Sequence, residues 1–455
     1  MPSCGIGQGN EMDLEQGNIK KIFFRYLAAA FGSACILCVY GIVDMAVIGQ
    51  YYGPDGTAAM SVVMPFFNII YGLGLLVGIG GSVLYGAERG RNGGTQNEYF
   101  TVGLIEAVFF SLIVWVVLIF FDEPLLYFFG ADESLFPLAE EYMVSIRVAA
   151  PVFLFSQFFG AFLRNDGAPG LATAAVIISG VFNVFGDIWF VFVMDMGIVG
   201  AGIATCMGSG VSVCIMLTHF LSKRNTLALV RVHAFWKKSA EIVVSGFATF
   251  FTDLALGIIT VFFNRQIMSC MGSAALAVFG ILMNINTFVQ CCGYSVGQAS
   301  QPIFSVNYGA GRNGRVRELL ILAGGTAVAF GGVWLVLILC VPNAFVRLFM
   351  SPTDEVLSIA PSIMRVYGIA FLFVPFNVFS TYYFQSVMRP RMSFAVSLLR
   401  GLLLSGTLIM LLPVMFSADA LWWAMPLAEG FTAVAAIAMI WLSRPKGAPG
   451  PSDAL

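Results

Sequence analysis

The chain alternates long apolar stretches with short polar segments from residue 22 almost to its end. A helix needs about 20 apolar residues to cross a lipid bilayer, and twelve stretches reach that length. The predicted spans are 22–50, 56–85, 98–121, 138–163, 168–193, 197–221, 238–270, 273–306, 316–341, 355–384, 392–416 and 419–443. Turn-forming Gly and Pro residues separate them, so we expect an all-α integral membrane protein with twelve transmembrane helices and short loops.

The composition supports the same class. Hydrophobic residues make up 59% of the 455 residues and charged residues 11%, whereas soluble domains have about 45–50% and about 25%. A soluble fold does not have enough polar residues to cover so much apolar surface. The net charge of −2 gives no reason to expect a nucleic-acid partner. We expect a monomer whose partners are the lipid bilayer and small molecules.

Basic residues predict the orientation of the chain. Of the 23 Lys and Arg residues, eighteen lie in the two tails or in the loops that follow even-numbered spans, Arg164 among them. Only Arg265 and Arg347 lie on the other side, and three more lie within spans. Cytoplasmic loops of membrane proteins carry the excess of Lys and Arg. We therefore expect a multi-pass protein of the plasma membrane (a bacterial inner membrane) with both termini in the cytoplasm.

The two halves of the chain repeat each other. Gly56-Thr57-Ala58-Ala59 returns as Gly272-Ser273-Ala274-Ala275, and Gly90-Arg91-Asn92 returns as Gly311-Arg312-Asn313. Six spans in each half predict parallel repeats, that is, two six-helix lobes related by a pseudo-two-fold axis along the membrane normal. The expected divisions are an N-terminal tail (1–21), a first lobe (22–221), a basic linker (222–237), a second lobe (238–443) and a C-terminal tail (444–455).

Four polar residues of the first half predict a cation site. Asn183 and Asp187 are four residues apart and share one helix face, while Thr205 lies in the next span and Asp44 in the first. A charge at the bilayer centre costs about 2.5–3.5 kcal/mol on insertion scales, so such residues are functional candidates. Their oxygens suit Na⁺, and two crowded carboxylates also hold a proton readily. A purely structural polar cluster is the alternative.

The second half lacks this set at the matching positions, so ion coupling should belong to the first half alone. It has two other acidic residues within apolar spans, Asp253 and Glu429. They face a central cleft and attract cationic substrates, or they form structural ion pairs with Arg400 or Arg365. The nine cysteines lie mostly in apolar spans, and we expect buried thiols rather than metal ligands or redox pairs.

Several short stretches together point to a known family. They are Val43–Gly49, Gly167–Pro169 followed by Asn183 and Asp187, Gly197–Thr205, Gly297–Ile303 and Asn307–Ala310. In this combination, over residues 20–443, the sequence resembles the multidrug and toxic compound extrusion (MATE) family, most closely its MepA-like branch. Many relatives bend the first helix at a proline, whereas this chain has Ala28-Ala29-Ala30 in that stretch.

The resemblance implies a two-lobed exporter that works by rocker-switch alternating access, with H⁺ or Na⁺ antiport against organic cations and drugs. It implies that the first-lobe cation site consists of Asp44, Asn183, Asp187 and Thr205, with H⁺ or Na⁺ as coupling ion and no cofactor. The residues expected at the substrate cleft are Asp253, Glu429, Gln298, Gln301, Gln385 and Arg400.

Two other functions stay open. A flippase of lipids or lipid-linked oligosaccharides in the same superfamily would need a cationic cleft, but five intramembrane acidic residues outnumber three intramembrane arginines. An intramembrane enzyme would need a nucleophile–base pair or metal ligands at membrane depth, and both histidines, His219 and His233, lie at loop edges. We therefore expect a transporter and not an enzyme.

Overall fold

The computed structural model describes residue 14 and residues 16–131, 133–349 and 353–442, and helices make up most of this part of the chain. The α-helices are α1 (Ile19–Tyr52), α2 (Pro54–Arg91), α3 (Gln96–Phe120), α4 (Asp122–Phe128), α5 (Phe136–Asn165), α6 (Pro169–Asp187), α7 (Gly197–Leu217), α8 (Phe235–Cys270), α9 (Ser273–Gly309), α10 (Asn313–Cys340), α11 (Pro342–Phe349), α12 (Asp354–Gly368), α13 (Val374–Ser386), α14 (Pro390–Leu398), α15 (Leu404–Met415) and α16 (Ala424–Leu442). The π-helical and 3₁₀ segments are η1 (Ile188–Val193), η2 (Thr218–Leu221), η3 (Ile369–Leu372), η4 (Leu399–Leu403) and η5 (Ala418–Trp423).

Twelve helical runs among these described residues are long and apolar enough to cross a membrane. Each of their ends lies within five residues of a predicted span. Several are composite: α12, η3 and α13 together form the run Asp354–Ser386. The expectation of an all-α membrane protein with twelve spanning helices is confirmed, because the apolar length that a bilayer demands is visible in sequence.

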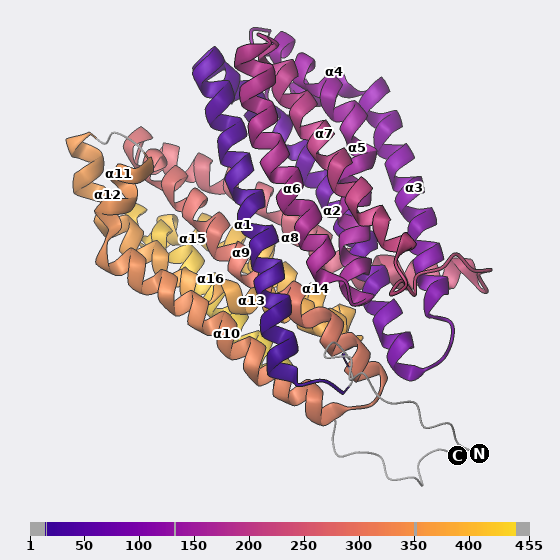
Figure 1. Cartoon of the computed structure of the whole chain (residues 1–455). Coiled ribbons are helices and arrows are strands. Elements are labelled where there is room, and N and C mark those ends of the chain that lie inside the picture. The colour runs from indigo at the N-terminus through magenta and orange to yellow at the C-terminus, as the bar shows by residue number, and fades with distance from the viewer. Residues whose placement is uncertain (1–13, 15, 132, 350–352, 443–455) are drawn as a thin grey trace, which may run out of the picture.

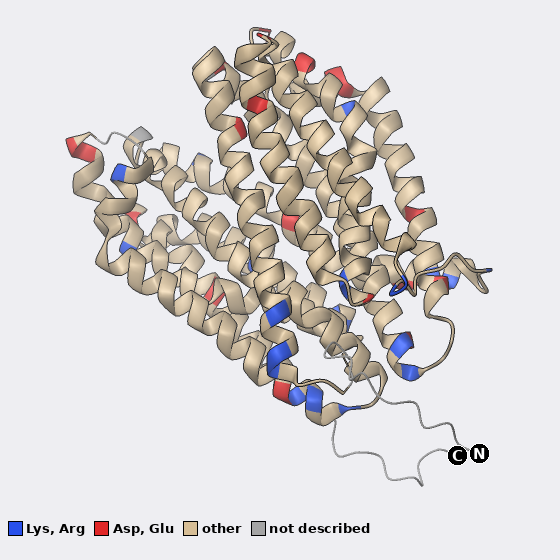
Figure 2. Cartoon of the chain, in the orientation of Figure 1, with Lys and Arg blue, Asp and Glu red and all other residues tan. Residues whose placement is uncertain are grey.

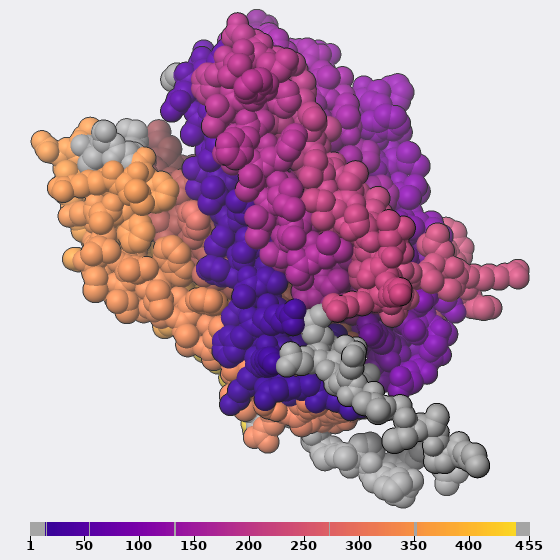
Figure 3. Space-filling view, in the orientation of Figure 1, coloured from indigo at the N-terminus to yellow at the C-terminus, as the bar shows by residue number. Residues whose placement is uncertain are grey.

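The helices form two lobes, α1–α7 and α8–α16 (Figure 1). The lobes diverge at one end, where the space-filling surface is notched between them (Figure 3). Most Lys and Arg residues lie at the opposite end, and most acidic residues outside the membrane helices lie at the notched end (Figure 2). We call these the basic end and the acidic end.

The two lobes meet in a tight seam near the basic end, where α2 packs against α8 and α9. Gln301 of α9 accepts a hydrogen bond from Asn165 Nδ2 over 3.1 Å and lies 3.3 Å from Ser82 Oγ of α2. Two glycines let the backbones touch: a Cβ at Gly90 would lie 2.0 Å from the Val306 carbonyl oxygen, and one at Gly309 would lie 2.0 Å from that of Ala87. Small residues allow such close helix approach in membranes.

Helix α1 packs against both lobes. Phe23 and Leu27, in its first half, share a buried cluster with Ile303 of α9 and other second-lobe residues. Val47 and Ile48, in its last third, belong to the buried core of the first lobe. The α1 helix was expected to belong to the first lobe, and the structure shows that it also connects that lobe to the second.

We predict that Gly90→Ala and Gly309→Ala each destabilise the protein by about 1–3 kcal/mol, the usual cost of overpacking. The matched control is Gly325→Ala in α10, where a Cβ would meet nothing within 4 Å; it measures the gain of about 1 kcal/mol that Ala gives a helix over Gly. The thermal unfolding midpoint of the purified protein checks this. If the seam variants are as stable as the control variant, the seam does not depend on the glycines.

Candidate cation site and central cavity

Four polar side chains of the first lobe meet in the membrane interior. Helix α1 supplies Asp44, α6 supplies Asn183 and Asp187, and α7 supplies Thr205. None of the four is more than 5% exposed. Because Asn183 and Asp187 are one helical turn apart, they reach the same neighbours on α1 and α7.

Hydrogen bonds connect the three helices at this point. The Asn183 Nδ2 donates to Thr205 Oγ1 over 2.9 Å and lies 3.5 Å from Asp44 Oδ1. The Thr205 hydroxyl lies 3.5 Å from Asp44 Oδ2. The Asp187 carboxyl faces that of Asp44 closely enough for a hydrogen bond when one of them is protonated. The structure thus brings together all four residues that the sequence singled out.

The acceptor oxygens of this cluster exceed its donors. Both Asp187 Oδ atoms and the Asn183 Oδ1 have no hydrogen-bond donor among the described residues. None of the ion pairs found in that part of the chain includes Asp44 or Asp187. An ionised carboxylate buried without a partner is very costly. A proton or a small hard cation bound by these oxygens would remove the cost of burying the charge. The oxygens suit both Na⁺ and H⁺.

The helix that carries the acidic pair is irregular at this point. Regular α6 ends at Asp187, and the π-helical segment η1 begins at Ile188. The second lobe has a π-helical segment in the equivalent span, η4, which contains Arg400. Such π turns often occur at functional sites because they redirect side chains and loosen the backbone hydrogen bonds.

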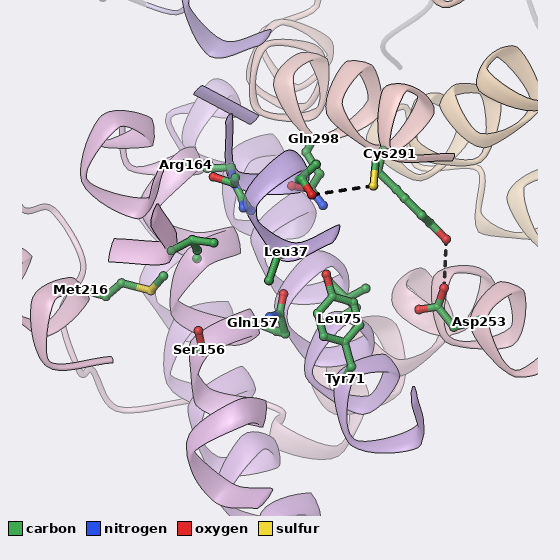
Figure 4. A pocket seen from close by; sticks show the side chains of 15 residues that line it. Leu37, Tyr71, Leu75, Ser156, Gln157, Arg164, Met216, Asp253, Cys291 and Gln298 are labelled. Atoms are coloured by element: carbon green, nitrogen blue, oxygen red, sulfur yellow. Dashed lines mark hydrogen bonds between the residues drawn. The ribbon is translucent and has the colours of Figure 1, made fainter. Parts of the chain in front are cut away.

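A cavity of about 150 Å³ lies between the lobes (Figure 4). Helices α1, α2 and α5 of the first lobe and α8 and α9 of the second contribute most of its wall. Its larger polar side chains are Tyr71, Gln157, Arg164, Asp253, Tyr294 and Gln298. Apolar side chains such as Leu37 and Leu75 complete the wall. An apolar wall with a few polar groups is typical of small-molecule sites.

Asp253 places a carboxylate in the wall of this cavity. Its Oδ1 accepts a hydrogen bond from the Tyr294 hydroxyl over 2.9 Å, as the dashed line at Asp253 shows (Figure 4). Its Oδ2 has no partner among the described residues. This carboxylate therefore retains acceptor capacity for a positively charged group inside the cavity.

Arg164 is the cavity residue that the sequence analysis misplaced. It was expected in a loop at the basic end, but α5 continues to Asn165 and puts the side chain in the cavity wall, across from Asp253 (Figure 4). No carboxylate of the described residues forms an ion pair with it. The internal repeat could have indicated this position. The equivalent residue, Gln385, lies 221 positions later and is also polar within an apolar span.

Of the six residues expected at the substrate cleft, Asp253 and Gln298 line the cavity. Gln301 and Gln385 are not among the residues that line it. Gln301 lies in the seam, and Gln385 is fully buried within the second lobe, where it donates to the Ser245 carbonyl over 3.0 Å and to Thr249 Oγ1 over 2.8 Å. Both amides form hydrogen bonds with buried polar groups of neighbouring helices. The sequence does not show which polar groups will be buried next to each other.

Glu429 and Arg400 also lie outside the cavity wall, and the ion-pair alternative describes them. The Glu429 Oε1 accepts from Arg400 Nη2 over 2.9 Å and from Nε over 3.2 Å. Its Oε2 accepts from Asn377 Nδ2 over 2.6 Å. Glu429 is 1% and Arg400 7% exposed, so the pair neutralises itself inside the second lobe. Arg365, the other possible partner, donates instead to the Leu339 carbonyl.

We predict that Glu429→Gln destabilises the protein by about 3–5 kcal/mol, because it leaves the Arg400 charge buried without a counter-charge. Replacing both residues with Met should recover part of the loss, since the unpaired charge is then gone. Glu355→Gln, at an exposed position of α12, is the control. Thermal unfolding midpoints in detergent measure the effect, and an unchanged midpoint for the single variant would contradict it.

Comparison with known proteins gives a consistent result. The MatE family profile matches residues 29–189 and 247–411. "Multidrug export protein MepA" of Staphylococcus saprophyticus is 22% identical over 445 residues, which cover 94% of this chain and 95% of that protein. The solved MATE multidrug transporter DinF-BH has a TM-score of 0.86 at 23% identity and covers 98% of this chain and 99% of its own. A solved outward-facing multidrug resistance MATE transporter of the MOP superfamily has a TM-score of 0.85 at 19% identity, covering 95% and 97%.

The two profile matches lie in the two lobes, one in each, and together make up well over half of the chain. The similarity to solved transporters extends over nearly every described helix, so the shared fold is the twelve-helix, two-lobed one. The resemblance seen in the sequence is thereby confirmed. This multi-pass membrane protein belongs to the MatE family.

Proposed function

We propose that the protein exports organic cations and drugs across the plasma membrane in exchange for H⁺ or Na⁺. The observation that carries the proposal is the pair of buried carboxyl groups, Asp44 and Asp187, with no Lys or Arg beside them among the described residues. An antiporter needs one site whose charge depends on a mobile ion and another that holds the substrate. The first lobe supplies the former and the cavity between the lobes the latter. The export function named for the MepA relative supports this assignment.

The basic end is proposed to face the cytoplasm, following the positive-inside rule. Both termini then lie inside the cell, and the seam between α2, α8 and α9 closes the cytoplasmic side. The notch at the acidic end then opens to the outside (Figure 3). In this orientation the notch faces outward, and one of the solved relatives is described as outward-facing.

Ion binding would act on the lobes through α1. A proton or Na⁺ from outside neutralises the Asp44–Asp187 pair and lets α1, α6 and α7 pack closely without charge repulsion. Because the first half of α1 packs on the second lobe, a shift of this helix changes how the lobes meet around the cavity. The ion favours substrate release only to the extent that it binds one conformation more tightly than the other. The lobes then rock, the ion leaves inward and the next substrate binds.

Asp253 is proposed to attract the cationic group of the substrate, assisted by Gln298 in the same wall. A charge–charge contact in a poorly hydrated cavity is stronger than the same contact in water. Glu429, Arg400, Gln301 and Gln385 would instead stabilise the second lobe and the seam, because their polar groups are largely used within the protein.

The flippase alternative is favoured by one observation, the guanidinium of Arg164 in the cavity wall, which no carboxylate of the described residues neutralises. An anionic lipid headgroup would pair with it. The Asp253 carboxylate in the same cavity would repel such a headgroup, so export of cations is the better-supported function. Transbilayer movement of a fluorescent anionic lipid in proteoliposomes, absent from protein-free liposomes, would reverse this preference.

We predict that Asp187→Asn abolishes ion-driven efflux, reducing it to the level of empty liposomes, because an amide carries no charge for the ion to neutralise. Efflux of a fluorescent organic cation is measured in proteoliposomes with pH and Na⁺ gradients imposed separately. Asp195→Asn, at an exposed position in the same lobe, is the control and should pump normally. The Asn amide can still donate to the facing Asp44 carboxyl, and no other donor among the described residues is lost, so the unfolding midpoint of Asp187→Asn should not fall. Normal pumping by that variant would refute the coupling role.

We predict that Asp253→Asn weakens binding of a monovalent fluorescent organic cation, such as a cationic rhodamine dye, about tenfold, equivalent to about 1.4 kcal/mol. Arg164→Gln is the matched variant: it removes the opposite charge from the same cavity and should leave cation affinity unchanged or raise it. Fluorescence polarisation of the dye with purified protein measures both. Equal weakening by the two variants would mean that cavity shape, and not charge, governs binding.

A further inference from the structure

Two thiols from opposite lobes touch beside the central cavity. The Sγ atom of Cys38, on α1, lies 2.8 Å from the Sγ atom of Cys291, on α9. These residues are 253 positions apart in the sequence, so only the packing of α1 against the second lobe brings them together. A disulfide has an S–S length of about 2.05 Å, so bonding would require the sulfurs to approach by about 0.8 Å.

The surrounding packing places Cys38 and Cys291 next to each other and keeps the neighbouring cysteines out of this contact. The Cys291 thiol also lies 3.8 Å from the Ala34 carbonyl oxygen, one turn before Cys38, so it is seated against α1. The neighbouring Cys292 is buried and accepts from Trp334 Nε1 over 3.4 Å. Cys35, also on α1, has no thiol contact of this kind among the described residues.

The cysteine pair lies beside the cavity and is only partly buried. Cys291 lines the cavity between the lobes, and neither Cys38 nor Cys291 is fully buried. Figure 4 shows Cys291 at the cavity wall near Gln298. Oxidation of a thiol depends on such access as well as on its chemistry.

We propose that Cys38 and Cys291 form an oxidative modification site, at which hydrogen peroxide converts the two thiols into a disulfide that joins the lobes. This proposal differs from the expectation that the cysteines are buried thiols and not redox pairs. One sulfur attacks the peroxide, which breaks the O–O bond, gives a sulfenic acid and releases one water. The second sulfur then displaces the hydroxyl of the sulfenic acid as a second water, so two thiols and one H₂O₂ yield one disulfide and two H₂O.

The bond would lock the transporter in the conformation described here. Cys38 lies between the part of α1 that packs on the second lobe and Asp44 of the cation site. A covalent link at this depth holds α1 against α9 next to the cavity. The movement of α1 that ion binding is proposed to cause would then be blocked, and the lobes could not rock. A dithiol reductant reverses the link by thiol–disulfide exchange.

The cross-link is tested on the full chain in proteoliposomes treated with hydrogen peroxide. Non-reducing digestion and mass spectrometry should find one peptide pair joined through Cys38 and Cys291, with a loss of two hydrogen masses, and the pair should disappear after dithiothreitol. Cys38→Ser and Cys291→Ser should abolish it, whereas the matched neighbours Cys35→Ser and Cys292→Ser should retain it. The unfolding midpoint of each variant confirms that it is folded.

A cross-link through Cys35 or Cys292 instead would overturn the proposed site. So would the absence of any cross-link when an alkylating reagent still reacts with both Cys38 and Cys291. The locking step rests on the proposed function and has its own readout: peroxide should slow wild-type efflux at least tenfold, dithiothreitol should restore it, and Cys38→Ser should be unaffected. A complete cross-link with unchanged efflux would overturn the lock alone. If the untreated protein shows no ion-driven efflux, the proposed function fails, and the mass measurement still decides the modification site.

Discussion

A carboxylate inside a membrane protein is stable only with a neighbouring positive charge or enough hydrogen-bond donors. The two lobes differ in whether they supply such partners. In the second lobe, Arg400 and Asn377 occupy both oxygens of Glu429. In the first lobe, Asp187 has neither a cation nor a donor among the described residues, and Asp44 has only distant ones. The second-lobe carboxylate is therefore paired within the fold, whereas the described residues provide no counter-charge for the first-lobe pair.

Helix α1 connects the buried carboxyl pair to the contact between the two lobes. It carries Asp44 within the first lobe, and its opposite half belongs to a buried cluster of second-lobe residues. Any ion that changes the packing of α1 at Asp44 therefore acts on a helix that both lobes hold. The contact of Cys38 with Cys291 lies on the same helix, between these two attachments. The glycine-lined seam at the basic end lets the lobes meet closely while their other ends stay apart.

The cavity between the lobes is lined by one acidic and one basic side chain, which come from different helices. Asp253 comes from α8 and Arg164 from the end of α5, and they lie on opposite sides of the cavity (Figure 4). Asp253 stands out in the sequence because it is an acidic residue within an apolar span. Arg164 was missed because it lies at the end of its span, where basic residues usually mark a cytoplasmic loop. Whether such a side chain turns toward solvent or inward depends on the neighbouring helices.

Sequence alone was enough to predict the twelve spans, the two-lobed repeat and the four residues of the first-lobe cluster. A bilayer imposes a fixed apolar length on each helix, and a buried acidic residue stands out against that background. The folded chain was needed to see that Glu429 pairs with Arg400, that Gln301 lies in the seam and that Cys38 contacts Cys291. These contacts join residues far apart in the chain, and their partners follow from how helices rotate and pack, which periodicity and composition do not specify.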